Sequence, residues 1–200
     1  MKIGTWMGVA VIASAAIAET APIVRASGAA GAPMGIEYRV LATTRTSTME
    51  KEMNAAAELG FQFMTIMGGE TAVGGNEAVA IMARMPGAPK GRLLYKMLAT
   101  NRTSTMEKEM QQAANDGFEY RAQTVFESSF GGREVACVME RNLDASGPRS
   151  EYRLLATNKT STMQKELQQA GDLGFEALGL TVAKTAFGGS ELVTIMRRRR

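Results

Sequence analysis

Apolar and polar residues follow two different periods along this chain, and the change from one period to the other predicts the elements. Residues 38–43 (YRVLAT) alternate in the manner of a β-strand. The next apolar residues have the i, i+4, i+7, i+8 spacing of one helix face and are Met49, Met53, Ala56 and Ala57. A second strand follows Phe61, and residues 76–84 (NEAVAIMAR) form a third. The predicted order is strand, helix, strand, strand.

This unit occurs three times, at an interval of 57 residues and without insertions. Its most similar part is a hydroxyl-rich phrase that reads LATTRTSTMEKEM from Leu41, LATNRTSTMEKEM from Leu98 and LATNKTSTMQKEL from Leu155. Self-similarity at a fixed period is the sequence signature of a repeat architecture. We therefore predict an α+β protein of three tandem β-α-β-β modules. The predicted modules are residues 37–86, 94–142 and 151–199.

The third strand of each module is apolar on both sides, which bears on how the modules pack. In the first copy the two sides are formed by Ala78, Ala80 and Met82 and by Val79 and Ile81. A strand of this kind is central in its sheet and covered on both faces, whereas the helix of one module covers one face. A unit this small, without a disulfide or a metal, is also near the lower size limit for independent stability. We predict that the modules pack together through sheet faces or edges and share one continuous core.

Two local signals predict where each helix begins and ends. A serine stands three residues before a Glu or Gln, which is the spacing of a capping box: the hydroxyl accepts from a first-turn N–H and the later side chain reaches back. The three pairs are Ser47 and Glu50, Ser104 and Glu107, and Ser161 and Gln164. Left-handed glycines are predicted to end the helices at Gly60, Gly117 and Gly174. Gly-Gly pairs predict tight hairpin turns at residues 74–75, 131–132 and 188–189.

Residues 1–18 (MKIGTWMGVAVIASAAIA) have the three parts of a secretory signal peptide. Lys2 gives a positive start, an alanine-rich apolar run follows, and small residues precede the predicted cleavage point after Ala18. A membrane anchor is the alternative, but the run is shorter than the ~20 apolar residues that a bilayer span requires. We predict a flexible leader over residues 19–36 and a periplasmic or secreted protein.

The net charge of the chain is +3, and it is unevenly distributed. Lys2 and the terminal run Arg197, Arg198, Arg199 and Arg200 supply five of the 23 basic residues, so 18 remain against 20 acidic ones. The rest of the chain therefore lacks the basic stripe of a nucleic-acid-binding domain. The arginine run is suited to contact an anionic surface, and a solvated terminus is the alternative.

The composition also limits the chemistry. The chain has no histidine, which excludes Ser-His-Asp and Cys-His catalysis and imidazole metal sites. Cys137, the only cysteine, occupies a small-residue strand position and is predicted to be a buried, inert thiol. Methionines one helical turn apart admit a thioether copper site, but Leu167 in the third copy favours core packing. The recurring carboxylates, read either as acid–base groups or as solvated first-turn residues, are Glu52, Glu109 and Glu166. We predict no catalytic residue, no metal and no cofactor.

Each predicted helix is preceded by a loop that carries a cation and hydroxyls (TTRTST, TNRTST and TNKTST). Backbone N–H groups at a helix N-terminus attract anions, so these loops are candidate sites for phosphate, sulfate or an acidic glycan. The alternative is that turn and cap geometry alone selects these residue types. The candidate residues are Arg45, Thr46, Ser47, Arg102, Thr103, Ser104, Lys159, Thr160 and Ser161.

Each copy also contains Tyr-[Arg/Lys]-x-Leu at its start, Lys-Glu in the helix, a Gly-Phe-[Glu/Gln] step and a closing Met-x-Arg. This pattern resembles the bacterial family catalogued as domain of unknown function 4177, whose short units run strand, helix, strand, strand. That family often has Trp where this chain has Phe61, Phe118 and Phe175. Because the family has no assigned activity, the resemblance implies a fold and no functional residues.

The sequence thus predicts an exported, non-catalytic protein that acts as a binding or structural module through a protein partner or self-association. Anion or small-ligand binding at the helix-start loops is the alternative, and an enzyme is a third. A pocket lined jointly by Arg45, Arg102 and Lys159 would favour ligand binding. A broad exposed apolar sheet face would favour assembly with a partner.

Overall fold

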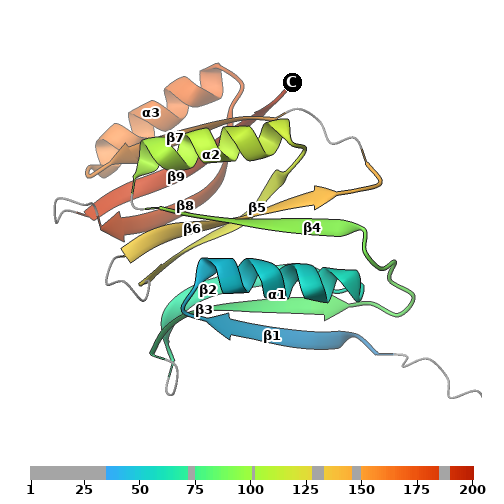
Figure 1. Cartoon of the computed structure of the whole chain (residues 1–200). Coiled ribbons are helices and arrows are strands. Elements are labelled where there is room, and N and C mark those ends of the chain that lie inside the picture. Colours follow the sequence, from blue (N-terminus) through green and yellow to red (C-terminus); the bar gives the residue numbers. More distant parts are fainter. Residues whose placement is uncertain (1–34, 72–74, 101, 128–132, 146–149, 185–189) are drawn as a thin grey trace, which may run out of the picture. The chain divides into compact units, whose positions relative to one another are not determined.

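A computed structural model of the chain describes residues 35–71, 75–100, 102–127, 133–145, 150–184 and 190–200 (Figure 1). All three modules fall within one compact unit. The predicted signal peptide, and the leader as far as residue 34, lie outside the described residues. No helix in the described ranges is long and apolar enough to span a bilayer.

The structure confirms the predicted fold of three β-α-β-β modules. The first module consists of β1 (Glu37–Thr43), α1 (Thr46–Glu58), β2 (Gln62–Thr71) and β3 (Gly75–Arg84). The second consists of β4 (Leu93–Thr100), α2 (Thr103–Asn115), β5 (Glu119–Glu127) and β6 (Arg133–Asn142). The third consists of β7 (Ser150–Thr157), α3 (Thr160–Asp172), β8 (Glu176–Lys184) and β9 (Ser190–Arg199).

Each module forms its own antiparallel sheet, in which the third strand lies in the middle. The strand orders are β1-β3-β2, β4-β6-β5 and β7-β9-β8. The central position of the third strand confirms the prediction made from its two apolar sides. The second strand of each module carries a one-residue bulge, at Met64, Arg121 and Leu178, where the pairing register shifts.

The helix ends agree with the sequence prediction. Gly60 has a φ of 90°, and its N–H donates to the Ala57 carbonyl oxygen at 2.9 Å, while the Phe61 N–H donates to the Ala56 carbonyl oxygen at 3.1 Å. This pair of bonds is a Schellman motif, which satisfies carbonyls that the helix leaves unbonded. Gly117 and Gly174 repeat it with positive φ values. Of the predicted hairpin glycines, Gly75 has a positive φ, and the other two turns lie outside the described residues.

The predicted capping boxes are wrong. The helices begin at Thr46, Thr103 and Thr160, and none of their N-cap residues makes a side-chain capping bond. Ser47 is therefore the second helical residue, and Glu50 does not reach back to the helix start. The glutamate side chain instead binds the backbone of the next module, because that edge strand has unpaired N–H groups that require an acceptor.

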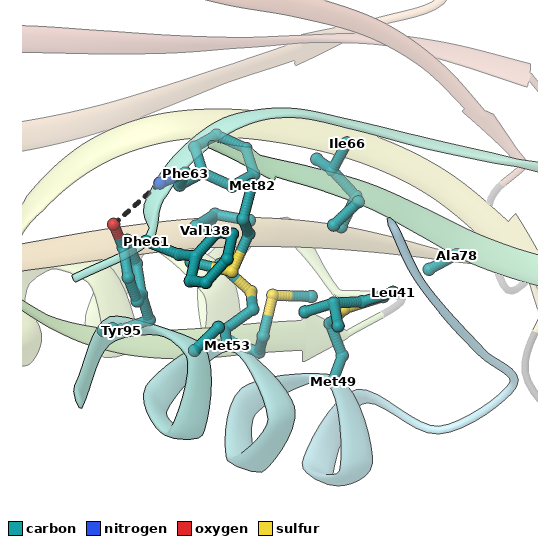
Figure 2. Close-up of a cluster of buried hydrophobic side chains, with 14 of the residues drawn as sticks. Leu41, Met49, Met53, Phe61, Phe63, Ile66, Ala78, Met82, Tyr95 and Val138 are labelled. Atoms are coloured by element: carbon teal, nitrogen blue, oxygen red, sulfur yellow. Dashed lines mark hydrogen bonds between the residues drawn. The ribbon is translucent and has the colours of Figure 1, made fainter. Parts of the chain in front are cut away.

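The hydrophobic core is divided into three clusters rather than being continuous as predicted. The middle sheet separates the first two, because alternate residues of a strand point to opposite faces. In β6, Val138 belongs to the cluster shared with the first module, whereas Cys137 and Met139 belong to the cluster shared with the third. Figure 2 shows the first cluster, in which Met49 and Met53 of α1 are fully buried beneath residues of both modules. The methionines fill the core, as the sequence favours.

Candidate interaction surface

The face of each sheet that points away from the helix of its own module is here called the front face of the module. Strand register assigns the residues to these faces. The front face of the first module contains Tyr38, Val40, Thr65, Met67, Val79, Ile81 and Ala83. The equivalent residues of the second are Tyr95, Met97, Ala122, Thr124, Ala136, Val138 and Glu140. Those of the third are Tyr152, Leu154, Gly179, Thr181, Val193, Ile195 and Arg197.

The first junction, between the first and second modules, joins α1 to the edge strand β4. The Asn54 amide donates to the Tyr95 carbonyl oxygen at 2.9 Å and accepts from the Tyr95 N–H at 2.8 Å. One turn earlier, Glu50 Oε2 accepts from the Met97 N–H at 2.8 Å. In return, the Tyr95 hydroxyl accepts from the Phe63 N–H at 2.9 Å (Figure 2). Helix side chains thus replace the neighbouring strand that β4 lacks.

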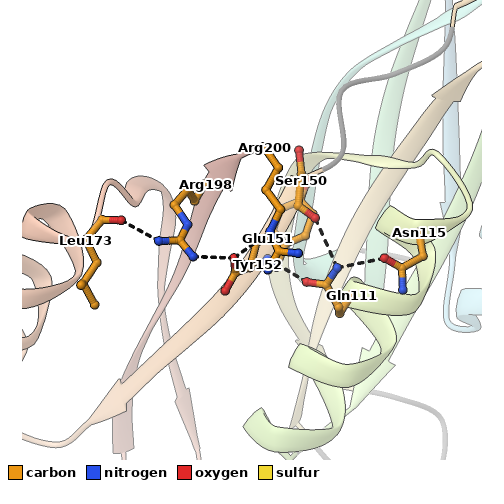
Figure 3. A network of polar contacts seen from close by, with 8 residues as sticks. All are labelled: Gln111, Asn115, Ser150, Glu151, Tyr152, Leu173, Arg198 and Arg200. Carbon is orange, nitrogen blue, oxygen red and sulfur yellow. Dashed lines mark hydrogen bonds and ion pairs between the residues drawn. The ribbon is translucent and has the colours of Figure 1, made fainter.

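The second junction, between the second and third modules, repeats this arrangement between α2 and β7. The Gln111 amide accepts from the Tyr152 N–H at 3.1 Å and donates to the Ser150 carbonyl oxygen at 3.3 Å (Figure 3). Glu107 Oε2 accepts from the Leu154 N–H at 2.8 Å. The Tyr152 hydroxyl accepts from the Tyr120 N–H at 2.9 Å. The tyrosine and glutamate contacts therefore recur after one repeat period, whereas the helix amide donates to the Tyr95 carbonyl in the first junction and to the Ser150 carbonyl in the second.

The junction tyrosines are in a low-dielectric environment. Burial raises the pKa of the Tyr95 hydroxyl above its usual range, and the nearby Glu140 charge adds to this effect. Burial also raises the pKa of Tyr152. Both hydroxyls are thus neutral over the ordinary pH range, while each accepts one backbone N–H.

The C-terminal arginines are part of the third module rather than a separate tail. Arg197 is buried, and its Nε donates to Glu176 at 2.8 Å, which holds the pKa of that carboxyl below its usual range. Arg198 donates to the Leu173 carbonyl oxygen at 2.9 Å and pairs with Glu151 at 2.7 Å (Figure 3). Arg84 makes the equivalent contacts in the first module, so this role of Arg198 is structural. Arg200 also pairs with Glu151, and Arg199 is exposed.

Among the described residues, no other module covers the front face of the first module. The Tyr38 side chain is 65% exposed, whereas the equivalent Tyr95 is 3% exposed. Val40 is 63% exposed, and the equivalent Met97 is 8% exposed. Met67 on the same face is exposed as well. The front face of the first module thus carries an exposed apolar patch on its two edge strands, beside the half-buried Val79 and Ile81 of the central strand. An exposed apolar sheet face is the feature that favours assembly with a partner.

The nine predicted anion-site residues lie at the starts of three different helices. Arg45, Arg102 and Lys159 are the N-cap residues, and the threonines and serines occupy the first two helical positions. The backbone N–H of each of these residues donates to the hydroxyl of the threonine two positions earlier, as in the bond from Arg45 to Thr43 at 3.2 Å. The structure thus places these nine residues at three separate helix starts.

The other candidate groups are placed as follows. Cys137 is fully buried, and burial raises the pKa of its thiol. Glu52 lies exposed on α1, and Glu109 and Glu166 are half-buried on their helices. Within the part of the chain that the structure describes, no three acidic or cysteine side chains are grouped so that they could hold a metal ion.

Sequence reasoning missed the polar residues that join the modules. Their common feature is recurrence at the repeat period on one helix face and at one strand position: Glu50, Glu107 and Gln164; Asn54, Gln111 and Gln168; Tyr38, Tyr95 and Tyr152. Polar residues beside a buried methionine stripe are a signal that the helix face has a polar partner. The identity of that partner requires the structure.

Comparison of the chain with protein-family models, with curated proteins and with solved structures found no match. The resemblance to the domain of unknown function stays a prediction from the sequence pattern.

Proposed function

We propose that this is an exported, non-catalytic interaction protein whose binding surface is the front face of its first module. The observation that carries the proposal is the contrast between Tyr38, which is exposed, and Tyr95 and Tyr152, which are buried at equivalent positions. A contiguous apolar face on a soluble protein marks a site of association.

The residue types on this face support the same proposal. At the position where the second and third modules have Glu140 and Arg197, the first module has Ala83. At the neighbouring position on the second strand it has Gln62 in place of Glu119 and Glu176. The exposed face is thus less charged than the two faces that are buried, whereas a face adapted to water would be more charged.

Site-specific photo-crosslinking in the cells that produce the protein tests this function. Val40 is replaced by the photoreactive residue p-benzoylphenylalanine, and Glu52, which is exposed on α1, is replaced in a matched control. We expect a covalent adduct from position 40 and none from position 52, detected by immunoblot and identified by mass spectrometry. The absence of any adduct at position 40 would refute the proposed surface.

Anion binding at the helix-start loops is retained as the alternative proposal. It requires that at least one of Arg45, Arg102 and Lys159 lowers the free energy of a bound phosphate or sulfate. Isothermal titration of inorganic phosphate in low salt tests it, with a Lys159→Ala, Arg102→Ala, Arg45→Ala triple variant as the control. Heat of binding that is equal in both proteins, or absent from both, would rule this alternative out.

A further inference from the structure

The two internal junctions define a rule for how any front face of this protein is covered. In each junction the front face of one module packs on a surface of the preceding module, here called the back surface. In the first module the back surface consists of Glu50, Asn54, Phe63, Ile66 and Gly68. Its equivalents in the third module are Gln164, Gln168, Ala177, Leu180 and Val182.

Among the described residues, no other module covers the back surface of the third module. Leu180 is 60% exposed, whereas its equivalent in the first module, Ile66, is 3% exposed. Val182 is also exposed, and so are Gln164 and Gln168. The described residues therefore leave two complementary halves of one interface uncovered: the front face of the first module and the back surface of the third.

We propose that the partner of the front face is a second copy of this chain, bound head to tail through the back surface of its third module. The inference rests on the proposed function, because it names the occupant of the same surface. In this arrangement the step from one module to the next continues from chain to chain. Because the two surfaces differ, the contact is heterologous and builds either a closed ring or an open filament.

The groups that form the internal junctions are present at both ends. Tyr38 stands at the position of Tyr95 and Tyr152, whose hydroxyls each accept a backbone N–H in a junction. Ala177 stands at the position of the two residues that donate this N–H, Phe63 and Tyr120. Gln168 is the same residue type as Gln111, so its amide can bind the backbone of Tyr38 and Ile36 as Gln111 binds Tyr152 and Ser150. Both ends therefore carry the polar pattern of the junction as well as the apolar surface.

The expected contact is weaker than the internal junctions, for a specific reason. Gln164 stands where Glu50 and Glu107 accept a backbone N–H, and a neutral amide oxygen is a weaker acceptor than a carboxylate. The acceptor for the Val40 N–H is thus present but less stabilising. Solenoid proteins that remain monomeric place polar capping repeats at their ends, whereas the first and third modules of this protein both expose apolar residues.

Sedimentation velocity of the purified protein over a wide concentration range tests the inference. We expect the average mass to rise with concentration. Val40→Glu blocks the front face and Leu180→Glu blocks the back surface, and each variant alone is expected to weaken association by more than about thirtyfold, or about 2 kcal/mol. Because both residues are exposed, both variants should keep the unfolding temperature of the parent protein. Ala55→Glu, on the exposed side of α1, is the matched charge control and should associate normally.

Mixing the two blocked variants gives the decisive result. Each variant retains one intact surface, so an equimolar mixture should form a one-to-one pair and stop there. If only Val40→Glu prevents association and the mixture forms no pair, the front faces bind each other and the inference is wrong. A protein that stays monomeric at every concentration also overturns the inference. Crosslinking of position 40 to a different protein would then uphold the proposed function without this partner.

Discussion

The two internal junctions share the hydrogen bonds of their tyrosine and glutamate residues and differ in side-chain packing. In both, a tyrosine hydroxyl and a helix carboxylate accept backbone N–H groups at nearly equal distances. The packing differs where Phe63 and Ala122 of the first junction correspond to Tyr120 and Gly179 of the second. A Cβ atom added to Gly179 would clash with the Tyr120 hydroxyl oxygen and lie 3.0 Å from the Gln123 amide oxygen. The hydroxyl thus occupies space that a methyl group fills in the other junction.

This difference shows which part of the junction is fixed. The backbone of an edge strand has N–H groups that must be paired, so both junctions keep side chains that accept these N–H groups. Apolar contacts have no direction, and residues can exchange volume across the interface as long as the total is kept. A change in the first set should therefore have the same effect at both junctions, whereas a change in the second set should depend on the junction.

The largest expected effect is from removing the carboxylates that bind the edge strands. We predict that Glu50→Ala and Glu107→Ala each lower the free energy of unfolding by about 2–3 kcal/mol, because each leaves a strand N–H without its charged acceptor. Chemical denaturation followed by circular dichroism measures this. Gln164→Ala is the matched control, since the side chain of Gln164, at the equivalent position of the third module, is exposed.

The control variant should be measured at low protein concentration, where association does not contribute. We expect Gln164→Ala to change the free energy of unfolding by no more than about 0.5 kcal/mol. Equal losses for all three variants would show that these residues act within their own helices and do not stabilise the protein by binding the edge strand of the next module.

The next effect distinguishes the two junctions. We predict that Gly179→Ala lowers the free energy of unfolding by about 1–2 kcal/mol, because the new methyl group displaces the Tyr120 hydroxyl. Tyr120→Phe removes that hydroxyl and recreates the residue pair of the first junction. In a double-mutant cycle, the Gly179→Ala, Tyr120→Phe variant should lose less free energy of unfolding than the sum of the losses of the two single variants. Additive losses would mean that the two positions do not compensate each other.

The part of this fold that repeats locally could be predicted from the sequence. The strands, the helices and the glycines that end the helices follow from periods and residue types within a few positions, as at Gly60 with its φ of 90°. The central position of β3 followed from its two apolar sides. These predictions succeed because each depends on neighbouring residues along the chain.

The junctions could not be predicted, because their partners are distant in the sequence. Glu50 satisfies the local spacing of a capping box, but the backbone it binds lies 47 residues ahead. A local motif and a tertiary contact compete for the same carboxylate, and the edge strand has the stronger need of an acceptor. The sequence predicted that an exposed apolar sheet face would favour a partner, but it did not predict which of the three equivalent faces is exposed.

A smaller effect should appear at alkaline pH. Burial raises the pKa of Tyr95 and Tyr152, whereas a tyrosine in the unfolded chain titrates near about 10. The folded state therefore holds these protons more tightly, so their contribution to stability is complete below pH ~10 and is lost as the pH rises further, by at most about 1.4 kcal/mol per pH unit for each tyrosine. Urea denaturation at a series of pH values should show this decline. It should be shallower in Tyr152→Phe, and an unchanged slope would exclude a contribution from this tyrosine.

The smallest effect tests the helix start. Removal of a serine that caps a helix typically costs ~1 kcal/mol, but Ser47 is a helical residue with an exposed side chain, and the N-cap residue is Arg45. We predict that Ser47→Ala changes the free energy of unfolding by less than about 0.5 kcal/mol, since alanine is a better helix former and no capping bond is lost. Thr43→Val is the comparison variant, because the Thr43 hydroxyl accepts the Arg45 N–H at 3.2 Å and thereby fixes the turn before the helix. A larger loss for Ser47→Ala than for Thr43→Val would restore the capping box and remove the reason for assigning Glu50 to the neighbouring module.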